Sequence, residues 1–294
     1  MTDSARDPLL DVHPGDRWLV AVAHPDDESF GCGSTIAYAA TRGADVTVVC
    51  ATRGEAGETV PGTADGDLGT VREAELRRAA ARLGVARVDL LGYRDSGFDG
   101  DLPGGSLCAA PVEEVAAVLG SLIREQAPQV LLTLDGSDGH RDHLHVGAAV
   151  REAVAALEGP APLLVEQCLP NSLLRRWLDE MRAVRPDTAY HALDPAGLGR
   201  DDADITDVVG TSDVLDRREA AIAEHRSQVS PFEGLSEGLR RAFLTVDHLA
   251  RVRLPDRSRQ RPAARSVSAR RGRFLFPTEA ASCRRVDPAS RSTP

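Results

Sequence analysis

The sequence contains no lysine, and all 35 of its basic residues are arginine. Without lysine the chain can form no Schiff base with a carbonyl substrate, and it has no phosphate-loop lysine. Long apolar runs are also missing: stretches such as Val46–Ala51 are far shorter than the ~20 residues that span a bilayer. Residues 1–18 lack the basic front and apolar centre of a signal peptide. We therefore expect a cytoplasmic chain with no membrane contact.

Cysteine is scarce and widely spaced. The five cysteines are odd in number, and no two of them form a Cys-x-x-Cys pair. This pattern is typical of reduced thiols and favours neither a disulfide framework nor a cysteine zinc site.

Positive charge is scarce outside the C-terminal segment. The net charge is −10, yet residues 251–294 hold 12 arginines against three acidic residues, so the acidity lies in residues 1–250. Such an acidic body does not suit nucleic acid, whose phosphates need a basic surface. After Leu254 the sequence loses its periodicity. We expect an N-terminal lead-in over 1–16, one domain over 17–254 and an Arg-rich disordered tail over 255–294.

Short apolar runs alternate with helical patterns along the predicted domain. This alternation predicts an α/β fold, with a Rossmann-like, doubly wound, mostly parallel sheet and helices on both faces. The predicted strands are 18–23, 45–51, 87–91, 129–134 and 162–166. The predicted helices are 33–42, 71–83, 111–126, 143–157, 172–184 and 212–225.

Histidine and aspartate gather directly after two of the predicted strands. Ala23-His-Pro-Asp-Asp-Glu-Ser29 follows the first strand, and Asp135-Gly-Ser-Asp-Gly-His-Arg-Asp-His143 follows the fourth. In a doubly wound sheet these strands are commonly neighbours at the switch point, where ligands bind beyond the carboxyl ends. One crevice can therefore hold six side chains that carry chemistry: His24, Asp26, Asp27, His140, Asp142 and His143.

These side chains include the ligand set of a catalytic zinc site, which is two imidazoles, a carboxylate and a water. Because Asp26 and Asp27 are consecutive, we expect one to bind the metal and the other to act as general base on the bound water. A further protonated histidine can stabilise an oxyanion or protonate a leaving amine. The set fits amide hydrolysis with one Zn²⁺ per chain, although Fe²⁺ also accepts such ligands.

With these motifs the chain resembles the PIG-L/LmbE-like deacetylases, zinc hydrolases that remove N-acetyl groups from amino sugars and related amides. The resemblance covers about residues 17–254 and depends mainly on Ala23-His-Pro-Asp-Asp-Glu28 and His140-Arg-Asp-His143. Weaker matches are Thr52-Arg-Gly-Glu-Ala-Gly57, Val71-Arg-Glu-Ala-Glu75, Leu83-Gly84, Tyr93-Arg-Asp-Ser-Gly97 and His225-Arg-Ser-Gln228.

The resemblance implies a role for each matching residue. The implied metal ligands are His24, Asp27 and His143. The implied catalytic residues are Asp26 as general base and His140 as oxyanion stabiliser and proton donor, with Asp142 tuning or orienting His140. Arg72 and Asp95 match family positions that contact the sugar or polyol part of the substrate.

The sequence departs from the family pattern at three places. Arg141 stands where many members have proline, and we expect it to loosen the loop and add charge near the site. Ser137, Asp138 and Gly139 occupy the stretch where some members have a tyrosine, which leaves more of the oxyanion work to His140. Many members have a lysine before the motif that corresponds to His225-Arg-Ser-Gln228. In this sequence Arg217 and Arg218 lie in that region.

The leading hypothesis is a zinc-dependent hydrolase that deacylates a small N-acetylated amino sugar or conjugate. One alternative is a nucleotide-binding Rossmann-type enzyme, but Ile36 stands where its third motif glycine would be, and the acidic loop repels phosphate. Another is a metal-binding protein without turnover, against which the intact site residues argue. The sequence leaves the individual substrate and the oligomeric state open, a homo-oligomer included.

Overall fold

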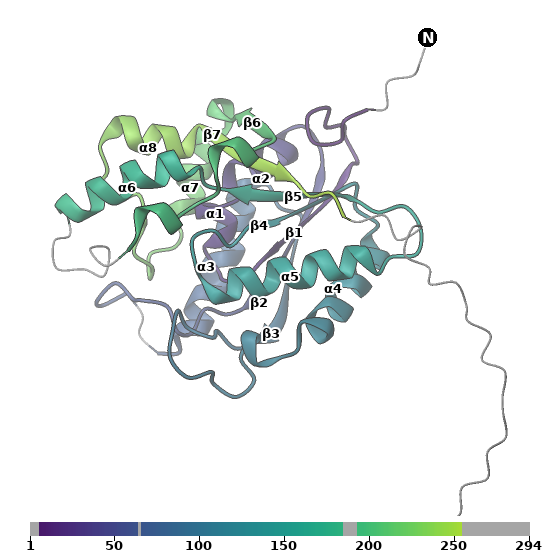
Figure 1. The fold of residues 1–294 in the computed structure, drawn as a ribbon, viewed down its shortest axis with the longest axis horizontal. Helices are drawn as coiled ribbons and strands as arrows, with labels where there is room; N and C mark the ends of the chain where they lie inside the picture. The colour runs from purple at the N-terminus through teal and green to yellow at the C-terminus, as the bar shows by residue number, and fades with distance from the viewer. Residues whose placement is uncertain (1–5, 64–65, 185–192, 255–294) are drawn as a thin grey trace, which may run out of the picture. The chain divides into compact units, whose positions relative to one another are not determined.

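The computed structural model describes residues 6–63, 66–184 and 193–254, which are arranged around a seven-stranded sheet (Figure 1). The strand order is β3-β2-β1-β4-β5-β7-β6. β1 to β5 run in parallel, while β7 is antiparallel to both β5 and β6. The strands are β1 (Arg17–Val22), β2 (Asp45–Thr52), β3 (Arg87–Tyr93), β4 (Val130–Leu134), β5 (Leu163–Cys168), β6 (Asp207–Gly210) and β7 (Val246–Arg251). The mostly parallel α/β sheet expected from the sequence is confirmed.

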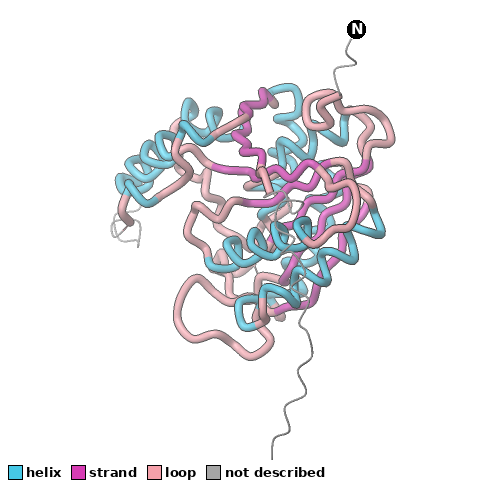
Figure 2. The backbone as a smooth tube through the Cα atoms, turned by 45° about the vertical axis from the view of Figure 1, so that its right-hand side comes forward, coloured by secondary structure: helices cyan, strands magenta, loops and turns pink. Residues whose placement is uncertain are grey.

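Helices cover both faces of the sheet, as Figure 2 shows. One face packs against α2 (Gly33–Thr41), α3 (Leu68–Leu83) and α7 (Leu215–Ile222), and the other against α4 (Val112–Gln126) and α5 (Arg141–Ala155). A separate apolar cluster joins α6 (Asn171–Val184) and α8 (Glu237–Leu244). The shorter helices are α1 (Asp27–Phe30), η1 (Leu107–Ala109), η3 (Pro195–Gly197), η4 (Asp202–Asp204) and η5 (Ser212–Val214).

The unbroken apolar sequence of β1 follows from burial on both faces. Val20 and Val22 pack in the cluster that contains Ile36 of α2, whereas Leu19 and Ala21 pack in the cluster that contains Leu119 of α4. Successive side chains of a strand point to opposite faces, so a strand covered on both sides reads as a continuous apolar run. This is the physical reason why the central strands could be predicted from the sequence.

The structure differs from the sequence prediction mainly at the C-terminal end of the sheet. The short strand β6, the strand β7 and the helix α8 were not predicted. β7 contains Asp247, a buried carboxylate that the residue pattern alone cannot distinguish from a surface residue. Helix α5 begins at Arg141 rather than His143, and His140 caps it.

Two further expectations concern the C-terminal tail and the membrane. The predicted tail over 255–294 lies outside the described residues. Within the part of the chain that is described, no helix is both long and apolar enough to cross a bilayer.

Candidate metal centre and active site

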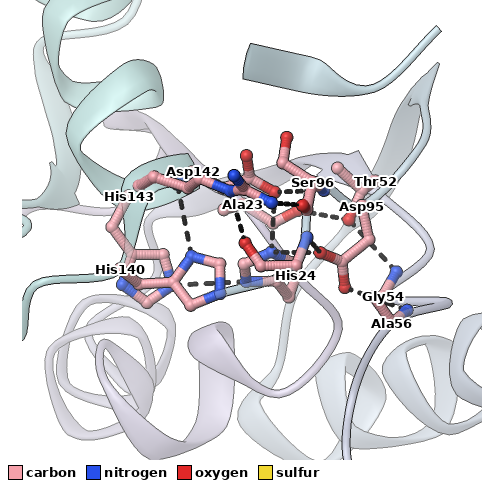
Figure 3. Close-up of polar contacts among 12 residues, drawn as sticks. Ala23, His24, Thr52, Gly54, Ala56, Asp95, Ser96, His140, Asp142 and His143 are labelled. Carbon is pink, nitrogen blue, oxygen red and sulfur yellow. Dashed lines mark hydrogen bonds and ion pairs between the residues drawn. The ribbon is translucent and has the colours of Figure 1, made fainter. Parts of the chain in front are cut away.

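Three loops meet beyond the carboxyl ends of the parallel strands β1, β3 and β4. The loop after β1 contains His24 and Asp26 and leads into α1 at Asp27, and the loop after β3 contains Asp95. The loop after β4 ends at His140, and Asp142 and His143 lie in the first turn of α5. The strand order reverses between β1 and β4, which pair directly, so the predicted switch point lies between these two loops. His24 lies in the middle of the site, with His140 and His143 on one side and Asp95 on the other (Figure 3). The structure thus brings the predicted clusters together.

Three ligand atoms at the ends of two of these loops converge on one point. His24 Nδ1 lies 3.3 Å from His143 Nε2 and 3.7 Å from Asp27 Oδ2, and His143 Nε2 lies 3.2 Å from Asp27 Oδ1. Ligands at about 2.0–2.1 Å from a tetrahedral zinc ion are roughly 3.3 Å apart, close to these separations. All three residues are buried, and the Asp27 carboxylate also accepts the backbone N–H of His24 at 2.8 Å. The arrangement fits a metal ion.

Each of the two histidines is held through its other ring nitrogen by a carboxylate. His24 Nε2 lies 3.1 Å from Asp142 Oδ2 and 3.6 Å from Asp95 Oδ1, and His143 Nδ1 lies 2.6 Å from Asp138 Oδ2. When both rings are neutral, each carboxylate accepts the proton of the nitrogen that it contacts, which leaves His24 Nδ1 and His143 Nε2 with lone pairs directed at each other. These lone pairs repel one another unless a cation lies between them. The tautomers set by the carboxylates therefore fit a metal site.

The electrostatics of the cluster also favour positive charge at this point. Burial alone would lower the pKa of His24, but hydrogen bonds to Asp142 and Asp95 raise it to about 9. Burial opposes charge on His143 as well, and the carboxylate of Asp27 nevertheless holds the pKa of His143 well above its usual range. The site stabilises a cation, whether it is a proton or a metal ion.

Asp26 lies in a strained turn beside this cluster. Its φ is +119°, a region that residues other than glycine rarely adopt. The Asp26 N–H donates to Glu28 Oε2 at 2.9 Å, and Arg72 Nη2 donates to Asp26 Oδ2 at 2.9 Å. Burial raises the pKa of Asp26 to about 6, although the charge of Arg72 opposes the rise. A carboxyl group with this pKa suits a general base near neutral pH.

Behind Asp26 is a buried pair whose role the sequence did not reveal. Glu28 and His225 have fully buried side chains, and His225 Nε2 lies 2.6 Å from Glu28 Oε1, which also accepts the Ser29 hydroxyl at 2.6 Å. In the sequence these two residues stand out only as members of two separate motifs, Ala23-His-Pro-Asp-Asp-Glu28 and His225-Arg-Ser-Gln228. The structure makes them partners that fix the turn containing Asp26. No sequence signal links positions so far apart.

Arg72 and Asp95, the residues predicted to contact the substrate, are both buried. Arg72 donates to the carbonyls of Gly54 at 2.6 Å and Pro25 at 2.5 Å, in addition to Asp26. A Cβ at Gly54 would lie 2.2 Å from Arg72 Nη1, so the guanidinium needs glycine there. The contacts observed for Arg72 are with the protein, and its contact with the substrate stays a prediction, as does that of Asp95.

His140 caps the N-terminus of α5, and its ring faces those of His24 and His143. Its Nδ1 accepts the backbone N–H of Asp142 at 3.2 Å, which places the proton of the neutral ring on Nε2. The ring centroid lies 4.6 Å from that of His24. Burial and the neighbouring imidazoles lower the pKa of His140 to about 4. His140 is therefore a neutral hydrogen-bond donor near pH 7.

The carboxylate of Asp142 forms its hydrogen bonds with groups other than His140. It contacts His24 Nε2 and accepts the Ser96 N–H at 3.0 Å and the Cys108 thiol at 3.0 Å. The backbone N–H of Asp142 donates to His140 Nδ1, and the Asp142 charge opposes the lowering of the His140 pKa, so a tuning or orienting role for Asp142 stays a prediction. In the first turn of α5 the buried side chain of Asp142 points toward the loops after β1 and β3, away from the imidazole of His140 (Figure 3).

The expectation that Arg141 loosens its loop is wrong. Its guanidinium donates to backbone carbonyls of residues 96–100 and so joins the start of α5 to the loop after β3.

Comparisons with known proteins agree with this geometry. The family described as PIG-L: GlcNAc-PI de-N-acetylase matches residues 19–154. A 1D-myo-inositol 2-acetamido-2-deoxy-alpha-D-glucopyranoside deacetylase from Thermobispora bispora is 38% identical over an alignment of 260 residues that covers 79% of this chain and 86% of the relative. A protein of the same name from Acidothermus cellulolyticus is 35% identical over an alignment of 248 residues that covers 76% of this chain and 85% of the relative.

Solved structures show the same fold. The N,N'-diacetylchitobiose deacetylase from Pyrococcus horikoshii superimposes with a TM-score of 0.57 at 21% identity, over 81% of this chain and 84% of that one. Together with the sequence relatives, of whose length this chain covers about 85%, the comparison confirms the resemblance first seen in the two histidine and aspartate motifs. The chain belongs to the PIG-L family of deacetylases, described as GlcNAc-PI de-N-acetylases.

Proposed function

We propose that this protein is a zinc-dependent N-deacetylase that releases acetate from an N-acetylated glucosamine conjugate. The observation that carries the proposal is the convergence of His24 Nδ1, His143 Nε2 and an Asp27 carboxylate oxygen beside Asp26. The substrate class follows the relatives, which are named for the deacetylation of an acetamido sugar joined to inositol. Those names do not favour the nucleotide-binding alternative.

In this proposal His24, Asp27 and His143 would hold the metal ion, and Asp26 transfers the proton. When bound, zinc would supply Lewis-acid chemistry, namely polarisation of the amide carbonyl and a lower pKa for the attacking water. The carboxylate of Asp26 accepts a proton from the water that attacks the carbonyl carbon. As the C–N bond breaks, Asp26 returns this proton to the nitrogen, and the products are the free amine and acetic acid, which ionises to acetate.

His140 stabilises the negative charge that forms on the carbonyl oxygen. We infer that it does so as a neutral imidazole, through the N–H on Nε2, because its Nδ1 is occupied by the backbone of Asp142 and its pKa is lowered. For this reason we assign the proton of the leaving amine to Asp26 rather than to His140. Arg72 then holds the Asp26 carboxylate in place.

The test is an assay of released amine with the purified full chain. The inositol-linked N-acetylglucosamine should be deacetylated faster than free N-acetylglucosamine or diacetylchitobiose, because the proposed substrate follows the relatives. Deacetylation of none of these, by protein that contains a bound metal, would contradict the proposal and favour a metal-binding protein without turnover.

Metal content provides a separate prediction. The untagged protein should contain about one zinc or iron per chain by elemental mass spectrometry, and a His24→Ala, His143→Ala double variant should contain almost none. The variant should fold, as judged by circular dichroism, since only the metal centre is altered. An equal metal content in both proteins would show that the metal binds elsewhere.

Asp138 should strengthen metal binding through His143. Asp138→Ala removes the acceptor at 2.6 Å from His143 Nδ1 and should weaken zinc affinity about 10- to 100-fold in chelator competition. Asp138→Asn retains an acceptor oxygen, so its zinc affinity should lie between those of Asp138→Ala and the unchanged protein. The control is Asp179→Ala, at an exposed position on α6. An unchanged affinity of Asp138→Ala would mean that this contact does not position the ligand.

The cytoplasmic location stays a prediction.

A further inference from the structure

We propose that Arg141 is a positioning residue that clamps residues 96–100 against the start of α5 and so fixes the wall of the substrate site beside His140. The inference extends the proposed function, because it concerns how that site holds its substrate. It depends on this chain's own contacts at a position where many family members have proline.

All three nitrogens of the Arg141 guanidinium donate hydrogen bonds to backbone carbonyls of the loop after β3. Nε donates to the carbonyl of Gly97 at 2.7 Å, Nη1 to that of Gly100 at 3.0 Å and Nη2 to that of Asp99 at 2.9 Å. Nη2 also donates to the carbonyl of Ser96. A planar guanidinium with five N–H groups can satisfy four carbonyls at once, whereas the single ammonium of lysine cannot reproduce this fork.

The backbone of this loop is shaped to receive a cation. Gly97 and Gly100 have φ values of +70° and +77°, which turn the chain so that neighbouring carbonyls face a common centre. Without a donor these carbonyl dipoles would repel one another and would depend on water for hydrogen bonds. The loop conformation and the arginine therefore support each other.

The clamped segment touches the candidate active site at its start and at its middle. At its start, the Ser96 N–H donates to Asp142 Oδ2 at 3.0 Å, and the Gly97 N–H donates to Asp95 Oδ1 at 2.7 Å. Further along, the ring of Phe98 lies edge-to-face against His140 with centroids 5.5 Å apart, although the residue remains 60% exposed.

An exposed aromatic ring beside the group that binds the reacting carbonyl adds apolar area for an organic substrate. Release of the clamp would let this wall move. Because the wall contacts bound substrate rather than the reacting atoms, its movement should weaken binding more than it slows the chemical step.

The experiment compares Arg141→Met and Arg141→Lys in the metal-loaded full chain. In Arg141→Met the amides of Ser96 and Gly97 should exchange hydrogen about tenfold faster or more, because the segment opens more readily. KM for the acetamido sugar should rise roughly tenfold, with kcat changed less than threefold. Arg141→Lys should give smaller changes in the same direction. Zinc affinity should stay within about twofold, since no metal ligand is altered.

The matched control is Arg175→Met, at an exposed arginine of α6, which should leave exchange, KM and kcat unchanged. Unchanged exchange at Ser96 and Gly97 in Arg141→Met would overturn the clamp. Faster exchange with unchanged KM would overturn its role in substrate binding. The exchange measurement needs no turnover, so a failure of the proposed deacetylase activity would be distinguished from a failure of the clamp.

Discussion

Replacing Asp26 by asparagine or alanine should lower kcat about 10²- to 10⁴-fold, the usual contribution of a general base, and leave the metal content unchanged. Neither replacement can accept the proton from water. Asparagine is the better test, because it has nearly the same shape as aspartate, can still accept the hydrogen bond from Arg72 and tolerates positive φ better than most residues. Steady-state kinetics and elemental analysis of the same preparation check both statements.

Replacing the neighbouring residue, Asp27, should affect metal binding as well as activity. Asp27→Asn should lose metal as well as activity, because Asp27 Oδ1 lies 3.2 Å from His143 Nε2 among the proposed ligand atoms. Asp213→Asn, on the surface, should change neither quantity. Near-normal turnover of Asp26→Asn would assign the base elsewhere. Loss of metal from Asp26→Asn would instead make Asp26 a ligand.

Replacing Arg218 by alanine should lower the free energy of unfolding by about 3–5 kcal/mol, the cost typical of breaking a buried ion pair. The side chain of Arg218 is 3% exposed and that of Asp247 is 1% exposed, and Nη1 of the arginine lies 3.2 Å from Asp247 Oδ1. The guanidinium also donates to the carbonyls of Phe30 at 2.5 Å and Phe243 at 2.9 Å. The variant therefore leaves one buried carboxylate and several carbonyls without their donor.

Thermal unfolding should show this loss as a decrease in Tm of roughly 10 °C. Removing the carboxylate as well, in Arg218→Met with Asp247→Asn, should recover part of the loss because no unpaired buried charge remains. Arg77→Ala, which breaks an exposed pair with Glu73 on α3, should cost less than about 1 kcal/mol. If Arg218→Ala cost no more than Arg77→Ala, the buried pair would contribute little to stability.

Arg218 also illustrates a choice that the sequence left open. Arg217 and Arg218 are consecutive arginines in the region where the family pattern has a lysine, and nothing in the sequence distinguishes them. In the structure Arg217 is exposed and Arg218 is buried, because α7 turns only one of two consecutive positions toward β7 and α1. Packing decides which face of a helix is buried. Because the packing partners are distant in the sequence, the residue pattern around positions 217 and 218 does not reveal the buried face.

The sequence by itself determined the parallel sheet and the location of the candidate site. The continuous apolar runs of β1, β2 and β4 have that form because both faces of the sheet are covered. The motifs after β1 and β4 lie together because parallel strands direct their carboxyl ends to the same edge of the sheet. These properties are local or follow from chain order, so they can be read from residue patterns.

Only the tertiary structure decided how the candidate site is supported. It paired Glu28 with His225 beneath the turn of Asp26, and it brought the Asp142 carboxylate to His24. It also made Arg141 a clamp where the sequence suggested a loosened loop. In each case one group belongs to one segment and its partner to another. Their contact depends on the register and rotation of packed elements, which no single segment encodes.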